Sequence, residues 1–365
     1  MKVVVVGAGV IGCAVAHELT SRGADVRVVD MRGTGQGATR ASAGILAPYI
    51  EGHLAPLLRL GVCSLSLYDA FVRRVAADAG QEFDYRRTGT LQVARTDLEA
   101  ARLVEAGREL ATAEVPHELV GPEDVRRFEP ALSSAVVAGL VIPDHGYVDV
   151  TALVSALKIA AERRGAVWLT GTVQRLEPRE AGVRVVIDGH ASLEADAIVL
   201  AAGSWSGQIG LGRAPATPVR PIRGQLIHLR FARPPVSRVI WGDACYMVPW
   251  LDGSLLVGAT VEDVGFDESV TEEATRYLLE SALELLPAVA DAARVDVRVG
   301  LRPASADQMP LIGASSTMQG VFHATGHYRN GVLLAPLTAK LLADLMMDGR
   351  ADSTLDLVRP DRVGL

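Results

Sequence analysis

Residues 1–30 read MKVVVVGAGVIGCAVAHELTSRGADVRVVD and predict one complete βαβ unit. Residues 3–6 are a continuous β-branched run, which is typical of a strand buried on both faces. Over residues 10–21 the apolar side chains recur at helical spacing, and Gly23 ends this helix. Residues 26–29 form a second β-branched strand. The chain therefore begins as a dinucleotide-binding fold begins, with a strand, a helix and a second strand.

A glycine turn of the form G-x-G-x-x-G joins the first strand to the helix. Gly7 allows the tight turn, Gly9 lets the backbone approach a pyrophosphate, and Gly12 lets helix and strand pack closely. Asp30 follows 18 residues after Gly12, close to the spacing at which an acidic residue accepts hydrogen bonds from a ribose. The motif in this context predicts a bound dinucleotide. It leaves FAD and NAD open, whereas the acid at position 30 disfavours NADP.

The composition narrows the class of protein. A chain of 365 residues predicts two domains, and 49% hydrophobic residues without an uninterrupted apolar run of 18 predict no membrane span. A net charge of −7 provides no basic footprint for nucleic acid. Cys13, Cys63 and Cys245 are too few and too scattered for a disulfide framework or a zinc site. We therefore expect a cytoplasmic protein that binds no metal.

Two later stretches also look like backbone that lies against a ligand. Residues 33–48, GTGQGATRASAGILAP, are rich in small residues but more apolar than an ordinary surface linker. Residues 197–206, AIVLAAGSWS, form a strand that runs into a glycine turn. Both stretches indicate further close approaches of the backbone to the dinucleotide.

The middle of the chain predicts a different kind of sheet. Short strands at residues 225–230, 245–249 and 255–260, with an Asp252-Gly253 turn, are typical of an antiparallel sheet. The alternation of strands and helices returns after residue 299. We therefore expect two interleaved domains, with further helices at residues 54–79, 97–112, 150–164, 271–285 and 334–347.

His145 is a candidate that two interpretations fit. It lies in the turn DHGYVD, just before the helix expected from residue 150. A histidine there can be catalytic, but it more often satisfies the backbone of the turn. We favour the structural interpretation.

Taken together, these segments resemble glycine oxidases of the ThiO type, in the D-amino-acid-oxidase and sarcosine-oxidase group of flavoproteins. The resemblance covers residues 2–348 and rests on the glycine turn with Asp30, and on GATRASAGILAP, AAGSWS, PVRPIRGQ, CYMVP, GATVEDVGFD, GLRPASAD and GHYRNGVLLAP. It implies an α/β chain, α+β overall, in which a Rossmann-like FAD-binding domain is interleaved with an antiparallel-sheet substrate domain. We expect the FAD-binding domain at residues 1–85, 145–216 and 300–350. The substrate domain is expected at 86–144 and 217–299, and a tail that packs late or frays at 351–365.

The resemblance also implies the residues that hold FAD. The glycine turn and Asp30 would hold the ADP half, residues 39–44 would run beside the flavin, and residues 329–333 would border its pyrimidine end. Neither GATRASAG nor GLRPAS contains Cys or His, so we expect FAD without a covalent link. The expected cofactor residues are Gly7, Gly9, Val10, Ile11, Gly12, Asp30, Arg32, Thr39, Ser42, Ala43, Gly44, Ile45, Val173, Ala202, Gly203, Trp205, Gly300, His327, Arg329, Asn330, Gly331, Val332 and Leu333.

The resemblance further implies a substrate clamp of Tyr246 and Arg302, with Arg329 as a third catalytic residue. The guanidinium of Arg302 presents a fork of donors that matches a carboxylate, and Tyr246 adds a hydroxyl without charge. Two departures leave the size and polarity of the pocket open: Trp250 stands where relatives often have Arg, and Ala244 where some have His.

Trp250 carries an expectation about substrate size. Side chains alternate along a strand, so Tyr246, Val248 and Trp250 would share the face assigned to the active site. Trp250 would then form a rigid wall that limits bulk beyond the α-carbon. We expect glycine or sarcosine to be preferred, D-alanine to react more slowly and D-aspartate or D-phenylalanine negligibly.

The implied activity is FAD-dependent oxidative deamination of small amino acids such as glycine, sarcosine and D-alanine. The products would be an imine or 2-oxo acid, ammonia and, with oxygen as acceptor, hydrogen peroxide. The expected setting is thiamine thiazole synthesis by a homo-oligomer. The main alternative is a D-amino-acid or N-methyl-amino-acid dehydrogenase that passes electrons to a quinone or protein partner. The sequence leaves the preferred amine, the electron acceptor and the oligomer size open.

Overall fold

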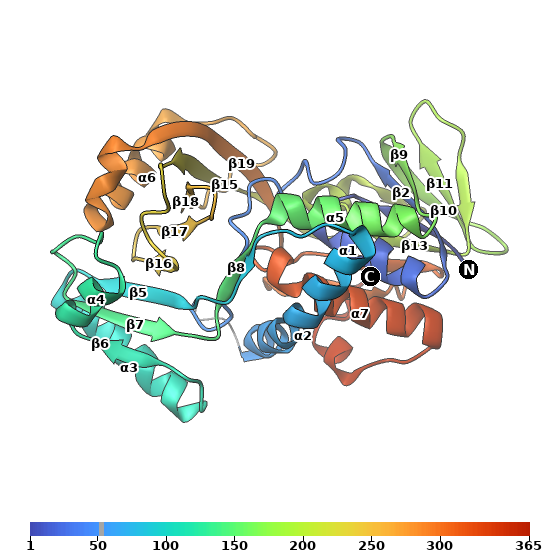
Figure 1. Ribbon diagram of the computed structural model, residues 1–365. Helices are drawn as coiled ribbons and strands as arrows, with labels where there is room; N and C mark the ends of the chain where they lie inside the picture. The colour runs from blue at the N-terminus through green and yellow to red at the C-terminus, as the bar shows by residue number, and fades with distance from the viewer. Residues whose placement is uncertain (51–54) are drawn as a thin grey trace.

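The computed structural model describes residues 1–50 and 55–365. Figure 1 shows two bodies side by side, with the chain crossing between them several times. One body is built on a six-stranded sheet and the other on an eight-stranded sheet. The helix expected from residue 54 is described from Ala55 onward, and its first expected residue lies outside the described part of the chain.

The six-stranded sheet contains the predicted βαβ unit. Its strand order is β20 (Leu311–Ala314), β21 (Val321–Thr325), β13 (Ala197–Leu200), β1 (Lys2–Val6), β2 (Asp25–Asp30) and β9 (Val167–Thr170). All neighbours pair in parallel except β20 with β21. Helix α1 (Val10–Ser21) has the bounds that the sequence predicts.

The two faces of this sheet bury different layers, because successive strand residues point to opposite sides. Val3 and Val5 of β1 pack in one core with α1, α2 (Ala55–Ala79), α5 (Val150–Arg163) and α7 (Gly331–Asp348). Val4 and Val6 pack in another core against a second sheet. The strands of that second sheet, in order, are β12 (Leu193–Ala195), β11 (Val183–Ile187), β10 (Val173–Pro178) and β14 (Gly210–Leu211).

The eight-stranded sheet forms the other body. Its strand order is β19 (Ala293–Ser305), β15 (Val219–Arg230), β18 (Ser254–Gly258), β17 (Tyr246–Pro249), β16 (Val239–Trp241), β5 (Thr90–Ala94), β7 (Ala138–Ile142) and β6 (Glu118–Val120). Every pair is antiparallel except β16 with β5, so the predicted antiparallel sheet is extended by an earlier stretch of chain. The helices α3 (Asp97–Thr112), α4 (Pro122–Phe128) and α6 (Glu272–Leu285) accompany it.

A small sheet lies where the chain passes between the bodies. It contains β3 (Ile45–Leu46), β8 (Gly146–Val148) and β4 (Tyr85–Arg86), with β8 in the middle. Figure 1 shows β8 between the two bodies. The mixed α/β fold, with its parallel and largely antiparallel sheets built from interleaved stretches of chain, is the expected fold class.

Of the two expectations for the C-terminal tail, packing late or fraying, the structure shows a packed tail. It forms the short 3₁₀ helices η3 (Ser353–Leu357) and η4 (Pro360–Val363), and Ile312 of β20 donates a backbone hydrogen bond of 2.9 Å to Val358. Leu355, Val358 and Leu365 are buried. Despite its many charged residues, the tail supplies enough apolar side chains to pack against the six-stranded body.

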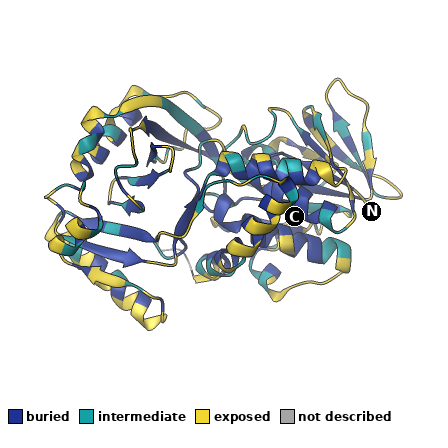
Figure 2. Ribbon diagram, viewed as in Figure 1, coloured by how far each residue is buried: buried dark blue, intermediate teal, exposed yellow. Residues whose placement is uncertain are grey.

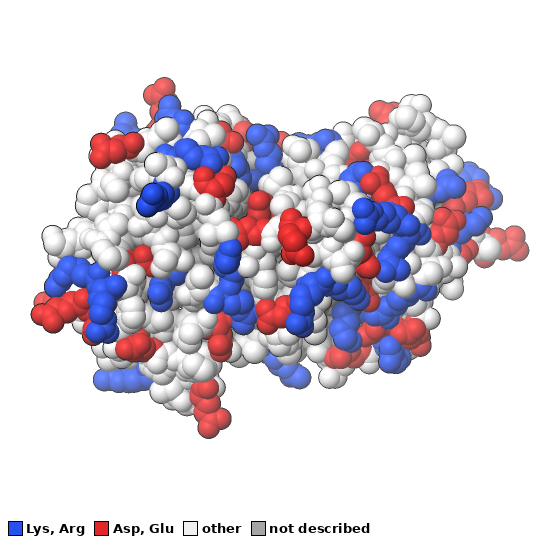
Figure 3. Space-filling model, viewed as in Figure 1, with Lys and Arg blue, Asp and Glu red and all other residues white. Residues whose placement is uncertain are grey.

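One helix in the described part of the chain, α2, is long and apolar enough to cross a membrane by length and composition. That is weak evidence, because a core helix passes the same test. Leu60, Leu65 and Tyr68 of α2 belong to the helical core described above, and Figure 2 shows the buried residues gathered inside both bodies. On the face drawn in Figure 3, basic and acidic side chains are interspersed.

Candidate active site

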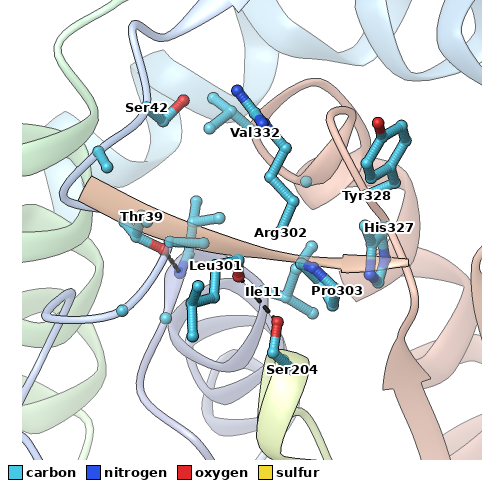
Figure 4. A pocket seen from close by; sticks show the side chains of 18 of the residues that line it. Ile11, Thr39, Ser42, Ser204, Leu301, Arg302, Pro303, His327, Tyr328 and Val332 are labelled. Atoms are coloured by element: carbon cyan, nitrogen blue, oxygen red, sulfur yellow. Dashed lines mark hydrogen bonds between the residues drawn. The ribbon is translucent and has the colours of Figure 1, made fainter. Parts of the chain in front are cut away.

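An elongated cavity of about 650 Å³ runs past the carboxyl ends of β1, β2 and β13 and reaches β17 and β19. In parallel α/β sheets, ligands bind at this edge because the loops and helix N-termini converge there. Figure 4 shows Ile11, Thr39, Ser42 and Arg302 around the cavity. Every predicted cofactor and clamp residue lines the cavity except Gly12.

The glycine turn is built for close approach. Gly7 has a φ of +108°, and a Cβ there would lie 2.3 Å from the carbonyl oxygen of Ala201. A Cβ on Gly12 would lie 1.9 Å from the carbonyl oxygen of Gly7, so Gly12 packs α1 onto the turn instead of lining the cavity. Gly9 lines the cavity itself, and the backbone there is open to a ligand. These are the three separate roles that the motif predicts.

Two polar side chains hold the turn from outside. The hydroxyl of Thr39 accepts a hydrogen bond of 3.0 Å from the N–H of Val10, in the first turn of α1. Asp30 accepts from the N–H groups of Ala8, Arg32 and Gly33 at 2.8 to 2.9 Å. A carboxylate has about four acceptor positions. Asp30 is therefore fixed in place while retaining capacity for a ribose hydroxyl.

The strand β19 crosses the cavity and is fixed on both sides. Ser204 donates a hydrogen bond of 2.8 Å to the carbonyl oxygen of Leu301, as Figure 4 shows. On Gly300, a Cβ would lie 2.7 Å from the Cβ of Ala41, so the strand passes directly against the loop that contains Thr39. The residue after Leu301 is Arg302, whose backbone is therefore held where the cavity passes β19.

The N-terminal turn of α7 forms another wall. Its helix dipole gives this end a partial positive charge, which suits an electron-rich ligand edge. The hydroxyl of Tyr68 donates to the carbonyl oxygen of Val332 at 2.5 Å, and Ser64 donates to that of Leu333 at 2.6 Å. Both donors lie on α2, so α2 fixes the position of the wall.

Two histidines of interest are neutral in the folded protein. His327 lines the cavity, contacts the Thr338 hydroxyl at 3.0 Å and is fully buried, which lowers its pKa to about 3. His145 does not line the cavity. It contacts Thr90 at 2.8 Å and stacks on Tyr49, and burial lowers its pKa to about 3. The environment of His145 fits the structural interpretation.

The far end of the cavity contains the predicted clamp. Arg302 donates from Nη1 to the carbonyl oxygens of Thr260 at 2.9 Å and Arg223 at 3.2 Å. Its guanidinium lies against Gly224, where a Cβ would come within 2.2 Å of Nη2. Gly224 lies diagonally across from Arg302 in the β15–β19 pair. The sequence interpretation missed Gly224, since its importance depends on cross-strand register.

Tyr246 has the same kind of neighbour. It pairs directly with Gly258 across β17 and β18, and a Cβ on Gly258 would lie 2.5 Å from the tyrosine hydroxyl oxygen. On its other side Tyr246 pairs with Trp241 of β16, with ring centroids 5.1 Å apart. The cross-strand row of Trp241, Tyr246 and Gly258 lines the cavity.

The expectation that Trp250 forms the size-limiting wall is wrong. Trp250 does not line the cavity, and it packs near His228 with Arg298 over its ring at 5.7 Å. Strand β17 ends at Pro249, and at about 3.3 Å per residue Trp250 lies roughly 13 Å along the chain from Tyr246. The alternation of side chains along β17 predicted the face of the sheet on which Trp250 lies, but not its distance from the cavity. At the end of the cavity near Tyr246, the tryptophan that lines it is Trp241, and Ala244 also lines it.

The residues present fit FAD. The cavity is continuous from the glycine turn and Asp30, past the loop at residues 37–45, to the wall at α7. Gly7, Gly12 and Gly300 leave no room for side chains at the closest approaches. A long, partly flat dinucleotide needs this combination of a phosphate turn, a ribose acceptor and an extended slot.

The sequence matches the DAO family, described as FAD dependent oxidoreductase, over residues 2–345. It is 35% identical to the bifunctional protein ThiO/ThiG of Synechocystis sp., over 99% of this chain and 54% of that protein. It is 31% identical to the glycine oxidase of Geobacillus kaustophilus, over 97% of this chain and 94% of that enzyme. The chain spans about half the length of the bifunctional relatives it matches.

The comparison of folds also finds a glycine oxidase. The solved structure of glycine oxidase from Geobacillus kaustophilus superposes with a TM-score of 0.90 at 30% identity, covering 96% of each chain. The family match includes every segment that lines the cavity. Because it also extends over nearly the whole sequence, the protein belongs to the DAO family of FAD-dependent oxidoreductases.

Proposed function

We propose that the protein oxidises the amine of glycine, sarcosine and D-alanine, forming an imine that hydrolyses to a 2-oxo acid and ammonia or, from sarcosine, a primary amine. Oxygen would be reduced to hydrogen peroxide. One observation carries the proposal: a single cavity joins a dinucleotide cradle to a site with Tyr246 and Arg302. When bound, FAD supplies the two-electron acceptor that this chemistry requires.

Arg302 and Tyr246 would bind and orient the substrate. A guanidinium forms two parallel hydrogen bonds to a carboxylate, which fixes both the position and the plane of the substrate. The hydroxyl of Tyr246 would donate a further hydrogen bond. Positioning of this kind supplies much of the rate in reactions where the cofactor does the bond chemistry.

The cavity would also favour the neutral amine, whose lone pair drives the oxidation. Arg302 and Arg329 both line it, and positive charge nearby disfavours the ammonium form. Among the described lining residues, the carboxylates are Asp30 and Asp243. Asp30 lies at the dinucleotide end, and Asp243 is exposed and paired with Arg102. The amine proton would therefore pass to solvent, without a dedicated base.

Four further proposals, on pathway, location, oligomeric state and domains, rest on the resemblance to ThiO-type glycine oxidases. The oxidised glycine would serve thiamine thiazole synthesis, and the enzyme would act in the cytoplasm as a homo-oligomer. The FAD-binding domain would comprise residues 1–85, 145–216 and 300–350. The substrate domain would comprise residues 86–144 and 217–299.

A peroxide assay across glycine, sarcosine, D-alanine and D-proline tests the function. We expect glycine and sarcosine to be turned over fastest and D-alanine more slowly. An oxygen electrode run with and without artificial electron acceptors separates an oxidase from a dehydrogenase. If oxidation requires the artificial acceptor, the protein is a dehydrogenase whose natural acceptor is a quinone or a protein partner. Absence of turnover with every amine and every acceptor would refute the proposal.

A further inference from the structure

Residues 259–262 follow β18 beside the cavity and contact Arg302 through Thr260. Ala259 and Val261 line the cavity, whereas Thr260 between them does not. The carbonyl oxygen of Thr260 accepts the 2.9 Å hydrogen bond from Arg302 Nη1. The interactions that fix the position of Thr260 therefore also help to orient the guanidinium of Arg302.

A network centred on Glu262 holds Thr260. Glu262 Oε1 accepts hydrogen bonds from the Thr260 hydroxyl at 2.5 Å and from Gln225 Nε2 at 2.9 Å. Its Oε2 accepts from Arg223 Nε at 3.0 Å and Nη2 at 2.5 Å. The backbones of Arg223 and Glu262 also exchange two hydrogen bonds, at 2.8 and 2.9 Å.

Arg223 is buried, Glu262 is partly buried, and both oxygens of the Glu262 carboxylate accept hydrogen bonds, so the geometry of the network is specific. The side chain of Arg223 is 5% exposed and that of Glu262 is 24% exposed. Burial alone would raise the pKa of Glu262, but hydrogen bonds from Thr260, Gln225 and Arg223 hold it below its ordinary value. A carboxylate with charge-assisted partners on both oxygens has little freedom to move.

We propose that Glu262 is a positioning residue for Arg302. It holds Thr260 through the hydroxyl and Arg223 through the guanidinium, and both of these residues offer their carbonyl oxygens to Arg302 Nη1. Bidentate binding of a carboxylate depends on the plane of the guanidinium as well as its position. The inference rests on the proposed function in one respect, namely that Arg302 binds the substrate carboxylate.

The first test is Glu262→Gln. It keeps the shape of the side chain but removes the negative charge of the carboxylate that accepts hydrogen bonds from Arg223 and Thr260. We expect the KM for glycine and the Kd for acetate, measured by calorimetry on the FAD-loaded enzyme, to rise about tenfold. FAD content should stay near that of the wild type. Asp263→Asn is the matched control, because it removes the same charge one residue away, from an exposed side chain paired with Arg220. The control should change neither constant more than about twofold.

The second test is a double-mutant cycle, which a general loss of stability would not satisfy. If Glu262 acts through Arg302, then Glu262→Gln in an Arg302→Ala background should weaken acetate binding by less than about twofold. Should Glu262→Gln fail to fold, Thr260→Val cuts the link to Glu262, together with the hydrogen bond of 2.9 Å from the Gln225 N–H, and should show the same coupling to Arg302→Ala.

Independent, multiplicative effects of the two substitutions would overturn the inference, as would an unchanged Kd in Glu262→Gln. Failure of the proposed function looks different, because the wild-type enzyme would then turn over no small amine in the presence of any acceptor. The double-mutant cycle on acetate binding measures the coupling between Glu262 and Arg302 whether or not the enzyme turns over an amine.

Discussion

At Arg302, the neighbours determine the role of one side chain. Arginine beside proline is an unremarkable pair in a sequence, but here Gly224 leaves space for the guanidinium and two backbone carbonyls hold Nη1. Arg302→Ala should lower kcat/KM for glycine by on the order of 10²-fold or more, because a carboxylate loses a charge-assisted bidentate partner.

Steady-state kinetics and the FAD-to-protein absorbance ratio check this prediction together. The ratio should be normal, because Arg302 lies at the end of the cavity away from the glycine turn. Arg302→Lys provides the matched comparison and should recover activity only in part, since an ammonium cannot form the fork. If the constants for glycine barely move in Arg302→Ala, another residue binds the carboxylate.

Trp241 and Trp250 make a second residue-scale comparison. Trp241 packs against Tyr246 in the cavity, whereas Trp250 packs beside His228 outside it. One methylene in an apolar pocket discriminates by about 1–3 kcal/mol. Trp241→Ala should therefore raise kcat/KM for D-leucine relative to glycine by about tenfold or more, and Trp250→Ala should leave that ratio unchanged. The reverse outcome would return the size limit to Trp250.

At the scale of elements, the turn between β1 and α1 combines packing and binding, and two substitutions separate them. Gly12→Ala forces a methyl group to within 1.9 Å of the Gly7 carbonyl oxygen, so α1 must move. We expect the apoprotein to lose roughly 1–3 kcal/mol of unfolding free energy.

Gly9→Val places its side chain at the cavity, and it should abolish FAD retention while the apoprotein stays folded. Urea unfolding and FAD titration distinguish the two, and a yellow, saturated Gly9→Val protein would contradict this assignment.

The elements also show how far the sequence could be interpreted. Helix α1 was predicted with its bounds and β1 and β2 to within one residue at each end, because strand, turn and helix signals there are local. Trp241, Gly224 and Gly258 could not be found in this way. Their roles depend on which residue lies opposite in a neighbouring strand, and periodicity along one strand contains no such register. Trp250 was misplaced for the related reason that alternation gives a face without a position.

At the scale of the molecule, buried histidines make stability depend on pH. Burial lowers the pKa of His145 and His327 to about 3 and that of His323 to about 4. In the unfolded chain these groups titrate near 6.5. Below pH 6.5 the unfolded chain therefore binds protons that the folded chain does not, and the unfolding free energy falls as pH falls. The loss is about 1.4 kcal/mol per pH unit for each such histidine, and it continues down to the folded pKa.

Urea unfolding of the apoprotein at pH 7, 6 and 5, at constant ionic strength, measures this slope. Most carboxylates are still ionised in that range, so the histidines dominate it. His145→Asn should lower the slope by the share of one histidine, whatever its effect on stability at pH 7. An unfolding free energy that is flat between pH 7 and pH 5 would contradict the buried neutral state.

The pairing of β15 with β19 has a consequence for local opening. The two strands pair from Val219 opposite Ser305 to Arg230 opposite Ala293, and Ala304 forms a bridge to His327 just before α7. This ribbon belongs to one body along most of its length and to the other at its end, so neither body can unfold without disturbing it. In native-state hydrogen exchange, the amides of β1, β13 and the ribbon should share one slow opening event. If the exchange free energies of the two bodies depended differently on denaturant concentration, the two bodies would unfold independently of each other.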